Sequence, residues 1–163
     1  MSGTVTNVVV AGLGGQGVLK ASDILAEAAF ASGLDVKKAE VHGMSQRGGS
    51  VTSDVRFGGR PASPMVPAGE ADFLVVLAVD QVENNRHHLR EGGVLIGPER
   101  IAPDDLPNPR SLNVALLGAL SHHLRIPRES FLAAVRANLP ERLHAVNEQA
   151  FAMGHQAESG ADD

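Results

Sequence analysis

The chain has 163 residues, 43% of them apolar and 20% charged, which is ordinary for one soluble globular domain and excludes a disordered or collagen-like chain. Its formal net charge is −5 and it has no Trp and no Tyr, so neither phosphate neutralisation nor base stacking supports nucleic-acid binding. It has no Cys, which excludes a disulfide, a thiolate nucleophile and a cysteine-ligated iron–sulfur cluster within these residues.

The first part of the chain alternates between strand and helix patterns. Residues 8–13 are a β-branched apolar run closed by glycines, which predicts a buried strand. Apolar residues recur at helical spacing over residues 17–32, and Gly33 can cap that helix. Residues 35–41 predict a second strand, and the alternation over residues 51–57 predicts a third.

The middle of the chain continues this alternation. Residues 73–79 are a continuous apolar run, typical of a strand that is covered on both faces. Asp80 can cap a helix over residues 80–89. The pair Gly92-Gly93 then predicts a turn into a short strand at residues 94–96.

The last third is predominantly helical in pattern. Four prolines mark residues 98–109 as an irregular connection, and helices are predicted over residues 112–124, 129–139 and 143–153. Residues 155–163 are polar and acidic without periodicity, which predicts a frayed tail.

These elements predict a single α/β domain of three α/β/α layers, with a Rossmann-like glycine turn and a helical C-terminal part. The expected domain covers residues 1–154, and residues 155–163 are the expected disordered acidic tail. No basic segment precedes the first apolar run, and no uncharged apolar stretch approaches the length of a bilayer span. We therefore expect a cytoplasmic protein without a membrane contact.

The first candidate for a binding site is the segment Gly12-Leu13-Gly14-Gly15-Gln16-Gly17, between a predicted strand and a predicted helix. Glycines allow a sharp turn, and free amides at a helix start attract an anion. The acidic residue that would hold a ribose about 20 residues later is not clearly placed. Three interpretations stay open: a phosphate-bearing ligand shared with a partner, NAD or FAD bound by this chain alone, and a purely structural turn.

The second candidate is the loop that contains Ser45, Gln46, Arg47, Gly48 and Gly49. Arg47 can bind a carboxylate or phosphate with its planar guanidinium, and the two glycines allow close approach of a ligand or another backbone. A surface loop whose Arg pairs with a neighbouring carboxylate is an equally ordinary interpretation.

In this order and at this separation, the two segments resemble the gamma-type domain of the thiamine-dependent 2-oxoacid:ferredoxin oxidoreductases, and within that family the indolepyruvate branch. The resemblance covers about residues 5–154. The residues that carry it are the glycine segment with its continuation to Ser22, the block from Val41 to Val51, Val55-Arg56-Phe57, Asp72, Leu117-Gly118 and the stretch from Asn147 to Gly154.

The resemblance implies a small subunit that supports oxidative decarboxylation of a 2-oxoacid, indolepyruvate or another aryl pyruvate, to an acyl-CoA, with two electrons passed to ferredoxin. It implies that thiamine diphosphate and the iron–sulfur clusters belong to a large partner subunit, and that coenzyme A is the co-substrate. This chain would hold no cofactor alone and no catalytic residue. By carry-over, the residues near the ligands are Gly12, Gly14, Gly15, Gln16, Gly17, Ser45, Gln46, Arg47, Gly48 and Gly49.

The histidines give a weak signal for other chemistry. Neither His87-His88 nor His122-His123 has the three- or four-residue spacing that places two imidazoles on one helix face, so we expect no metal site. His42 lies beside the Arg47 loop and could carry a proton, although a loop histidine bonded to a backbone carbonyl is the commoner case.

Two other functions compete with the small-subunit hypothesis. An independent nucleotide-binding module or small NAD(P)-linked reductase would bind NAD or FAD tightly without a partner. A subunit that only stabilises a large chain would tolerate Arg47→Ala without loss of turnover in the assembled complex.

Overall fold

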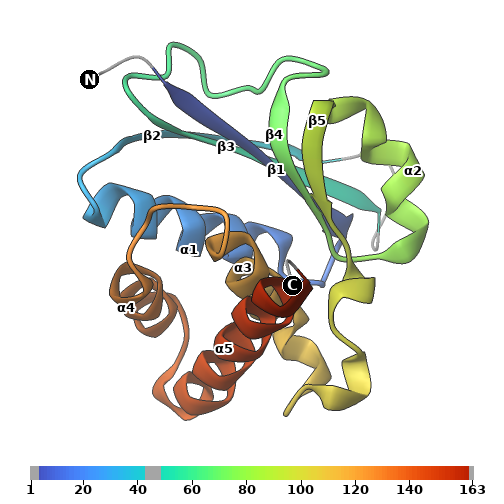
Figure 1. Ribbon diagram of the computed structural model, residues 1–163, viewed down its shortest axis with the longest axis vertical. Helices are drawn as coiled ribbons and strands as arrows, with labels where there is room; N and C mark the ends of the chain where they lie inside the picture. Colours follow the sequence, from blue (N-terminus) through green and yellow to red (C-terminus); the bar gives the residue numbers. More distant parts are fainter. Residues whose placement is uncertain (1–3, 43–48, 162–163) are drawn as a thin grey trace.

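The computed structural model describes residues 4–42 and 49–161, and these form a mixed five-stranded sheet with helices (Figure 1). The order of the strands in the sheet is β2-β3-β1-β4-β5. Strands β1, β4 and β5 pair in parallel, whereas β3 is antiparallel to both of its neighbours. The strands are β1 (Val5–Leu13), β2 (Asp35–His42), β3 (Ser50–Gly58), β4 (Ala71–Val76) and β5 (Leu89–Ile96).

The helices cover the two faces of the sheet unequally. Figure 1 shows α1 (Val18–Ala31), α3 (Leu112–Ser121), α4 (Arg128–Asn138) and α5 (His144–Ala161) together on one side of the sheet. The other face carries a smaller apolar cluster, closed by the short helix α2 (Val82–Asn85) and the loop that contains Val66. The prediction of a single α/β domain is confirmed, and its layers differ in thickness.

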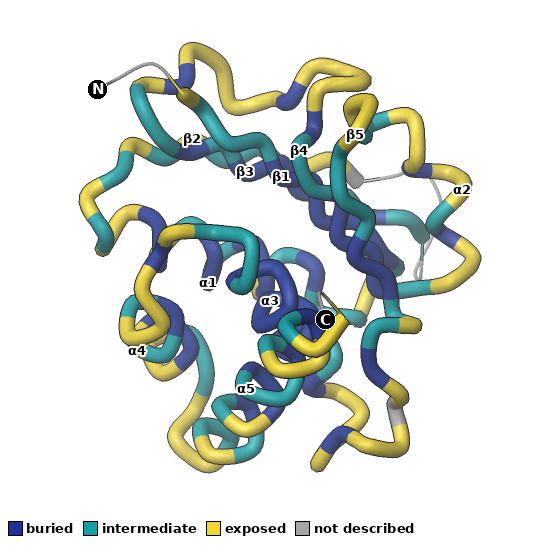
Figure 2. The backbone as a smooth tube through the Cα atoms, in the orientation of Figure 1, coloured by how far each residue is buried: buried dark blue, intermediate teal, exposed yellow. Residues whose placement is uncertain are grey.

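The central strand β1 explains why the strand pattern in the sequence was a continuous apolar run. Val8 and Val10 point into the main core beneath the helices, and Val9 and Ala11 point into the smaller cluster. All four side chains are fully buried (Figure 2), because both faces of this strand are covered. The position of β1 in the middle of the sheet places its carboxyl end, and the glycine segment that follows, at the centre of one sheet edge.

Two predicted elements in the middle of the chain differ from the structure. In place of the helix expected over residues 80–89, the structure has one turn of α-helix, α2, between two short 3-10 helices. The turn expected at Gly92-Gly93 lies inside β5, where the pairing with β4 jumps from Ala71–Leu89 to Phe73–Val94. The φ of Gly92 is 79°, so a glycine is favoured where the extra residues of β5 interrupt the pairing with β4.

The frayed tail expected from residue 155 is also corrected, because α5 runs on to Ala161. Its continuation has a tertiary cause, since Glu158 is only 3% exposed and is not a solvated tail residue. One carboxylate oxygen of Glu158 lies 2.9 Å from His123 Nε2 and the other 3.1 Å from Arg100 Nη1. These two contacts fix the last turns of the helix against α3 and the connection that follows β5. Residues 162–163 lie outside the described part.

Helices α3 and α5 cross with their backbones in direct contact. A Cβ added to Gly118 would collide with the carbonyl oxygen of Phe151, and one added to Gly154 would collide with that of Ala115. Only glycine permits this approach, which makes the two helices one rigid unit. Of the helices described, none combines the length and the apolar character that a bilayer crossing requires.

Candidate functional site

The predicted glycine segment forms a tight turn from β1 into α1. Gly15 and Gly17 have φ angles of 89° and 83°, a left-handed conformation that side chains disfavour. Gly17 is the N-cap of α1, and no side chain caps the helix there. The first turn of α1 contains no acidic residue, so its amides present uncompensated positive polarity.

Gln16 holds the shape of this turn from within. Its Oε1 accepts a hydrogen bond of 2.7 Å from the Leu13 amide, and its Nε2 donates one of 3.3 Å to the Leu77 carbonyl. A Cβ on Gly12 would lie 2.8 Å from the same Oε1, so Gly12 leaves room for the Gln16 side chain. The side-chain amide of Gln16 therefore ties the end of β1 to the segment that follows β4.

The second predicted segment reaches the glycine turn at Gly49. The Gly14 amide donates a hydrogen bond of 2.9 Å to the Gly49 carbonyl, which fixes the start of β3 beside the turn. Ser45, Gln46, Arg47 and Gly48 lie outside the described residues, as does the side chain of His42. The structure thus brings together the two candidate segments at their one described point of contact.

Two hollows flank the glycine turn. The larger, about 530 Å³, lies between the turn and the amino end of α3, where Arg110 and Asn113 form the opposite wall. The smaller, about 290 Å³, lies on the other side and is bordered by Lys20 and Val51. Neither Arg110 nor Lys20 forms an ion pair with a described residue, so two cations stand free beside two helix amino ends. This arrangement suits an anionic ligand such as a phosphate.

Arg110 and Asn113 were missed by sequence reasoning. They follow the proline-rich connection, which reads as irregular chain, and about 90 residues separate them from the glycine segment. Asn108 accepts a hydrogen bond from the Arg110 amide and so starts the short turn that leads into α3. An Asn-Pro pair before a helix indicates such a start, but nothing in the sequence indicates which site the helix faces.

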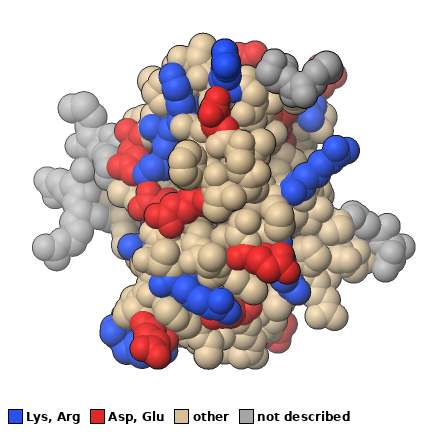
Figure 3. All heavy atoms as spheres, turned by 90° about the vertical axis from the view of Figure 1, so that its left-hand side faces the viewer, with Lys and Arg blue, Asp and Glu red and all other residues tan. Residues whose placement is uncertain are grey.

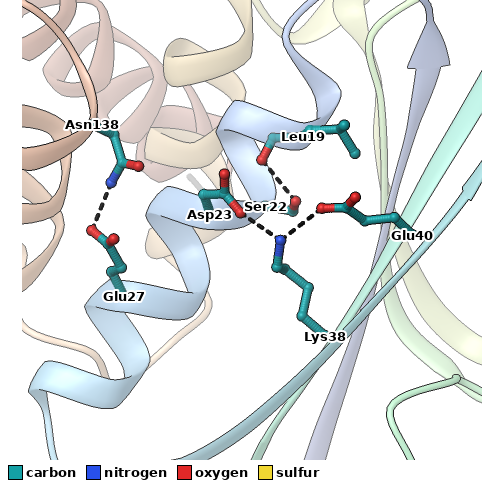
Figure 4. Close-up of polar contacts among 7 residues, drawn as sticks. All are labelled: Leu19, Ser22, Asp23, Glu27, Lys38, Glu40 and Asn138. Atoms are coloured by element: carbon teal, nitrogen blue, oxygen red, sulfur yellow. Dashed lines mark hydrogen bonds and ion pairs between the residues drawn. The ribbon is translucent and has the colours of Figure 1, made fainter.

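Helix α1 itself is held against the sheet and against α4 by polar contacts (Figure 4). Lys38 on β2 binds Asp23 of α1 and also Glu40, 2.8 Å away, while Asn138 of α4 donates a 2.6 Å hydrogen bond to Glu27. Burial alone would lower the pKa of Lys38, but its hydrogen bonds to the two carboxylates outweigh burial and raise it. Figure 3 shows acidic and basic side chains interspersed over this side of the molecule.

The described residues contain no group of three or more His, Asp or Glu side chains placed to share a metal ion. His87 and His88 stack on each other with ring centroids 4.1 Å apart. Burial, and then the neighbouring His87, lower the pKa of His88. The His87–His88 contact therefore joins two neighbouring rings and gathers no third side chain that could share a metal ion, among the described residues.

Comparisons with known proteins agree with this fold. The model of the pyruvate ferredoxin/flavodoxin oxidoreductase family matches residues 7–107, and the chain belongs to this family. The match includes the glycine turn and the whole Arg47 loop, and it ends just before Arg110.

Individual relatives show which members of this family the chain is similar to. The chain is 34% identical to the indolepyruvate oxidoreductase subunit IorB of Methanothermobacter thermautotrophicus, over 93% of this chain and 96% of that protein. It is 42% identical to the subunit of the same name from Pyrococcus horikoshii over 77% of this chain, and it spans 60% of that relative's length. The gamma subunit of a keto/oxoacid ferredoxin oxidoreductase from Geobacter sulfurreducens has the same fold, with a TM-score of 0.80, 25% identity, and 95% and 99% of the two chains covered.

Proposed function

We propose that this chain is the small subunit of a cytoplasmic, thiamine-dependent 2-oxoacid:ferredoxin oxidoreductase, with indolepyruvate or another aryl pyruvate as its substrate. The overall reaction converts the 2-oxoacid and coenzyme A to an acyl-CoA and carbon dioxide, with two electrons passed to ferredoxin. The observation that carries the proposal is the alignment with the Methanothermobacter subunit along nearly the full length of both chains.

The residues of this chain suit a supporting role. An iron–sulfur cluster needs thiolate ligands, and the sequence has no Cys, so the donor set does not fit a cluster. We therefore assign the clusters to a large partner subunit, and we assign thiamine diphosphate to the same subunit because the resemblance to the family implies it. On this proposal, the chain's own contribution is to bind and orient an anionic group at the edge of the partner's active site.

Coenzyme A is the ligand that the glycine turn suits best. Its phosphates are anions, and the turn offers uncapped helix amides with Arg110 and Lys20 on either side. We propose that Gly12, Gly14, Gly15, Gln16 and Gly17 shape this part of the site, and that Ser45, Gln46, Arg47, Gly48 and Gly49 face the partner or its ligands. The pantetheine thiol would then point away from this chain toward the reaction centre of the partner.

The test is reconstitution with the large subunit encoded in the same genome. The two chains are co-expressed without oxygen, purified as a complex, and assayed for viologen reduction with indolepyruvate, pyruvate and 2-oxoglutarate in the presence of coenzyme A. We expect turnover only with both chains present, and the highest kcat/KM with indolepyruvate. The isolated chain is titrated in parallel with NAD, FAD and coenzyme A.

Each outcome separates the competing functions. Micromolar binding of NAD or FAD by the isolated chain, with no gain in activity on adding the large subunit, contradicts the proposal and supports an independent nucleotide-binding module. Full activity of the complex carrying Arg47→Ala supports a subunit that only stabilises its partner. A preference for pyruvate or 2-oxoglutarate keeps the class of enzyme and changes the substrate.

A further inference from the structure

We propose that Asn113, at the amino end of α3, is the positioning residue that holds the glycine turn in its bent conformation. The proposal names a residue outside every motif that the sequence indicated. It rests on the proposed function only for the consequence of moving the turn, namely weaker use of coenzyme A. The contact itself stands on geometry alone.

The contact joins residues 96 positions apart in the sequence. Asn113 Nδ2 donates a hydrogen bond of 3.2 Å to the Gly17 carbonyl, while its Oδ1 accepts one of 2.9 Å from the Val114 amide. The second bond fixes which end of the side-chain amide faces the turn. Asn113 is 8% exposed, so it has little water to replace a lost partner.

Gly17 and Asn113 also fit each other sterically. A Cβ on Gly17 would lie 2.5 Å from Asn113 Nδ2, closer than atoms of this kind approach. The absence of a side chain at Gly17 therefore serves two purposes: it permits the positive φ angle, and it admits the amide of Asn113.

A turn built from glycines needs such an external contact. Glycine has the largest conformational freedom to lose on folding, and α1 lacks a side-chain cap at Gly17. Asn113 supplies its bond from a rigid base, because α3 is packed backbone to backbone against α5 through Gly118 and Gly154. The rigidity of this helix pair is thereby passed to the turn.

Hydrogen exchange tests the contact without any assumption about function. Asn113→Ala is compared with a matched control, Asn147→Ala, in the full chain. Asn147 is 7% exposed and borders a hollow beside Asn113, but its Nδ2 donates a 2.9 Å hydrogen bond to the Leu143 carbonyl and none to the glycine turn. We expect both variants to lower the melting temperature, but only Asn113→Ala to speed amide exchange over residues 13–18, by roughly fivefold.

Steady-state kinetics of the complex with the large subunit then test the consequence. Asn113→Ala should raise KM for coenzyme A by roughly fivefold with kcat changed less than about twofold, whereas Asn147→Ala should leave both unchanged. Asn113→Asp is the second variant, because it keeps the size of the side chain but sets an acceptor oxygen against the Gly17 carbonyl. It should reproduce both effects even if Asn113→Ala folds poorly.

Amide exchange and KM for coenzyme A test different parts of the proposal. Unchanged exchange over residues 13–18 in both Asn113 variants, or an equal rise in Asn147→Ala, overturns the positioning role. Faster exchange with an unchanged KM for coenzyme A supports the positioning role and instead contradicts the proposed ligand of the turn.

Discussion

The two ends of α3 use their charged side chains in opposite ways. Beyond its carboxyl end, the buried carboxylate of Glu158 is paired with Arg100 and His123. At its amino end, Arg110 faces the glycine turn and pairs with no described residue. At the first end the charged side chains contact each other within the chain and serve the fold, whereas Arg110 at the second end is available for a ligand or a partner.

Helix α3 thus joins a structural end, near Glu158, to a functional end, near Arg110. The rigidity at the α5 side comes from glycine contacts and a buried ion pair, and Asn113 carries it to the glycine turn. Substitutions at the structural end should therefore change stability, and those at the amino end should change ligand use.

The largest change in stability is expected from a glycine-to-alanine substitution, made once in the α3–α5 contact and once in the glycine turn. Gly154→Ala puts a methyl group onto the Ala115 carbonyl and should destabilise the chain by roughly 3 kcal/mol or more, because α5 must move away from α3. Gly15→Ala meets open space and should cost only about 1 kcal/mol for its positive φ. Urea unfolding monitored by circular dichroism compares them. Equal losses would remove the distinction between a packed and an open region.

Glu158→Ala tests the structural end directly. The substitution removes both contacts of a buried carboxylate and leaves the partly exposed Arg100 and His123 without this partner, so a loss of roughly 1–3 kcal/mol in the free energy of unfolding is expected. The last turns of α5 should also lose helical structure, seen as faster amide exchange over residues 155–161. A variant as stable as the parent, with an intact helix end, would show that the residues beyond Gly154 are helical for another reason.

Arg110→Gln tests the functional end. Its stability should stay within about 0.5 kcal/mol of the parent, because the guanidinium has no partner among the described residues. In the complex, KM for coenzyme A should rise roughly tenfold through loss of a charged contact to phosphate.

Arg125→Gln is the matched control for Arg110→Gln. Arg125 is also exposed and without a described ion pair, but it borders a separate hollow of about 780 Å³ near the other end of α3. The control should leave KM unchanged. An equal effect of both substitutions would indicate that net charge, and not the place of Arg110, governs affinity.

The smallest effect concerns an exposed ion pair that also joins α4 to α5. Arg136 lies 2.7 Å from Glu148, and its hydrogen bonds hold the pKa of that carboxyl below its ordinary value. The stability from Glu148 is therefore present above the unfolded-state pKa of 4.5 and is lost as the pH falls through the lower, folded-state pKa.

Glu148→Gln should flatten the acid side of the melting-temperature profile slightly, and high salt should abolish the difference. The measurement is thermal unfolding between pH 3 and pH 7 at low and high ionic strength. A larger loss of stability in Glu148→Gln than in Glu158→Ala would contradict the expectation that the exposed ion pair contributes less than the buried one.

Much of the fold was predictable from local patterns. Buried strands with both faces covered leave continuous apolar runs, so the strands at residues 8–13 and 73–79 were identified close to their positions in β1 and β4. Helical spacing identified α1, α3 and α4, and the glycines between β1 and α1 marked the turn. The glycine pair was assigned to a turn before β5 because a glycine of positive φ is as typical of a turn as of an interruption inside a strand.

The sequence by itself determined the α/β class, the turn at the end of β1 and the likeness to one enzyme family, because these depend on residues near each other in the chain. Tertiary structure alone decided that Asn113 meets Gly17, that Gly14 meets Gly49, and that Glu158 is buried and the chain around it helical. Each of these contacts joins segments far apart in the sequence, so it forms only once the helices have packed in their places on the sheet. The side-chain periodicity of a single element indicates which face is buried, but it holds no information about the partner that covers it.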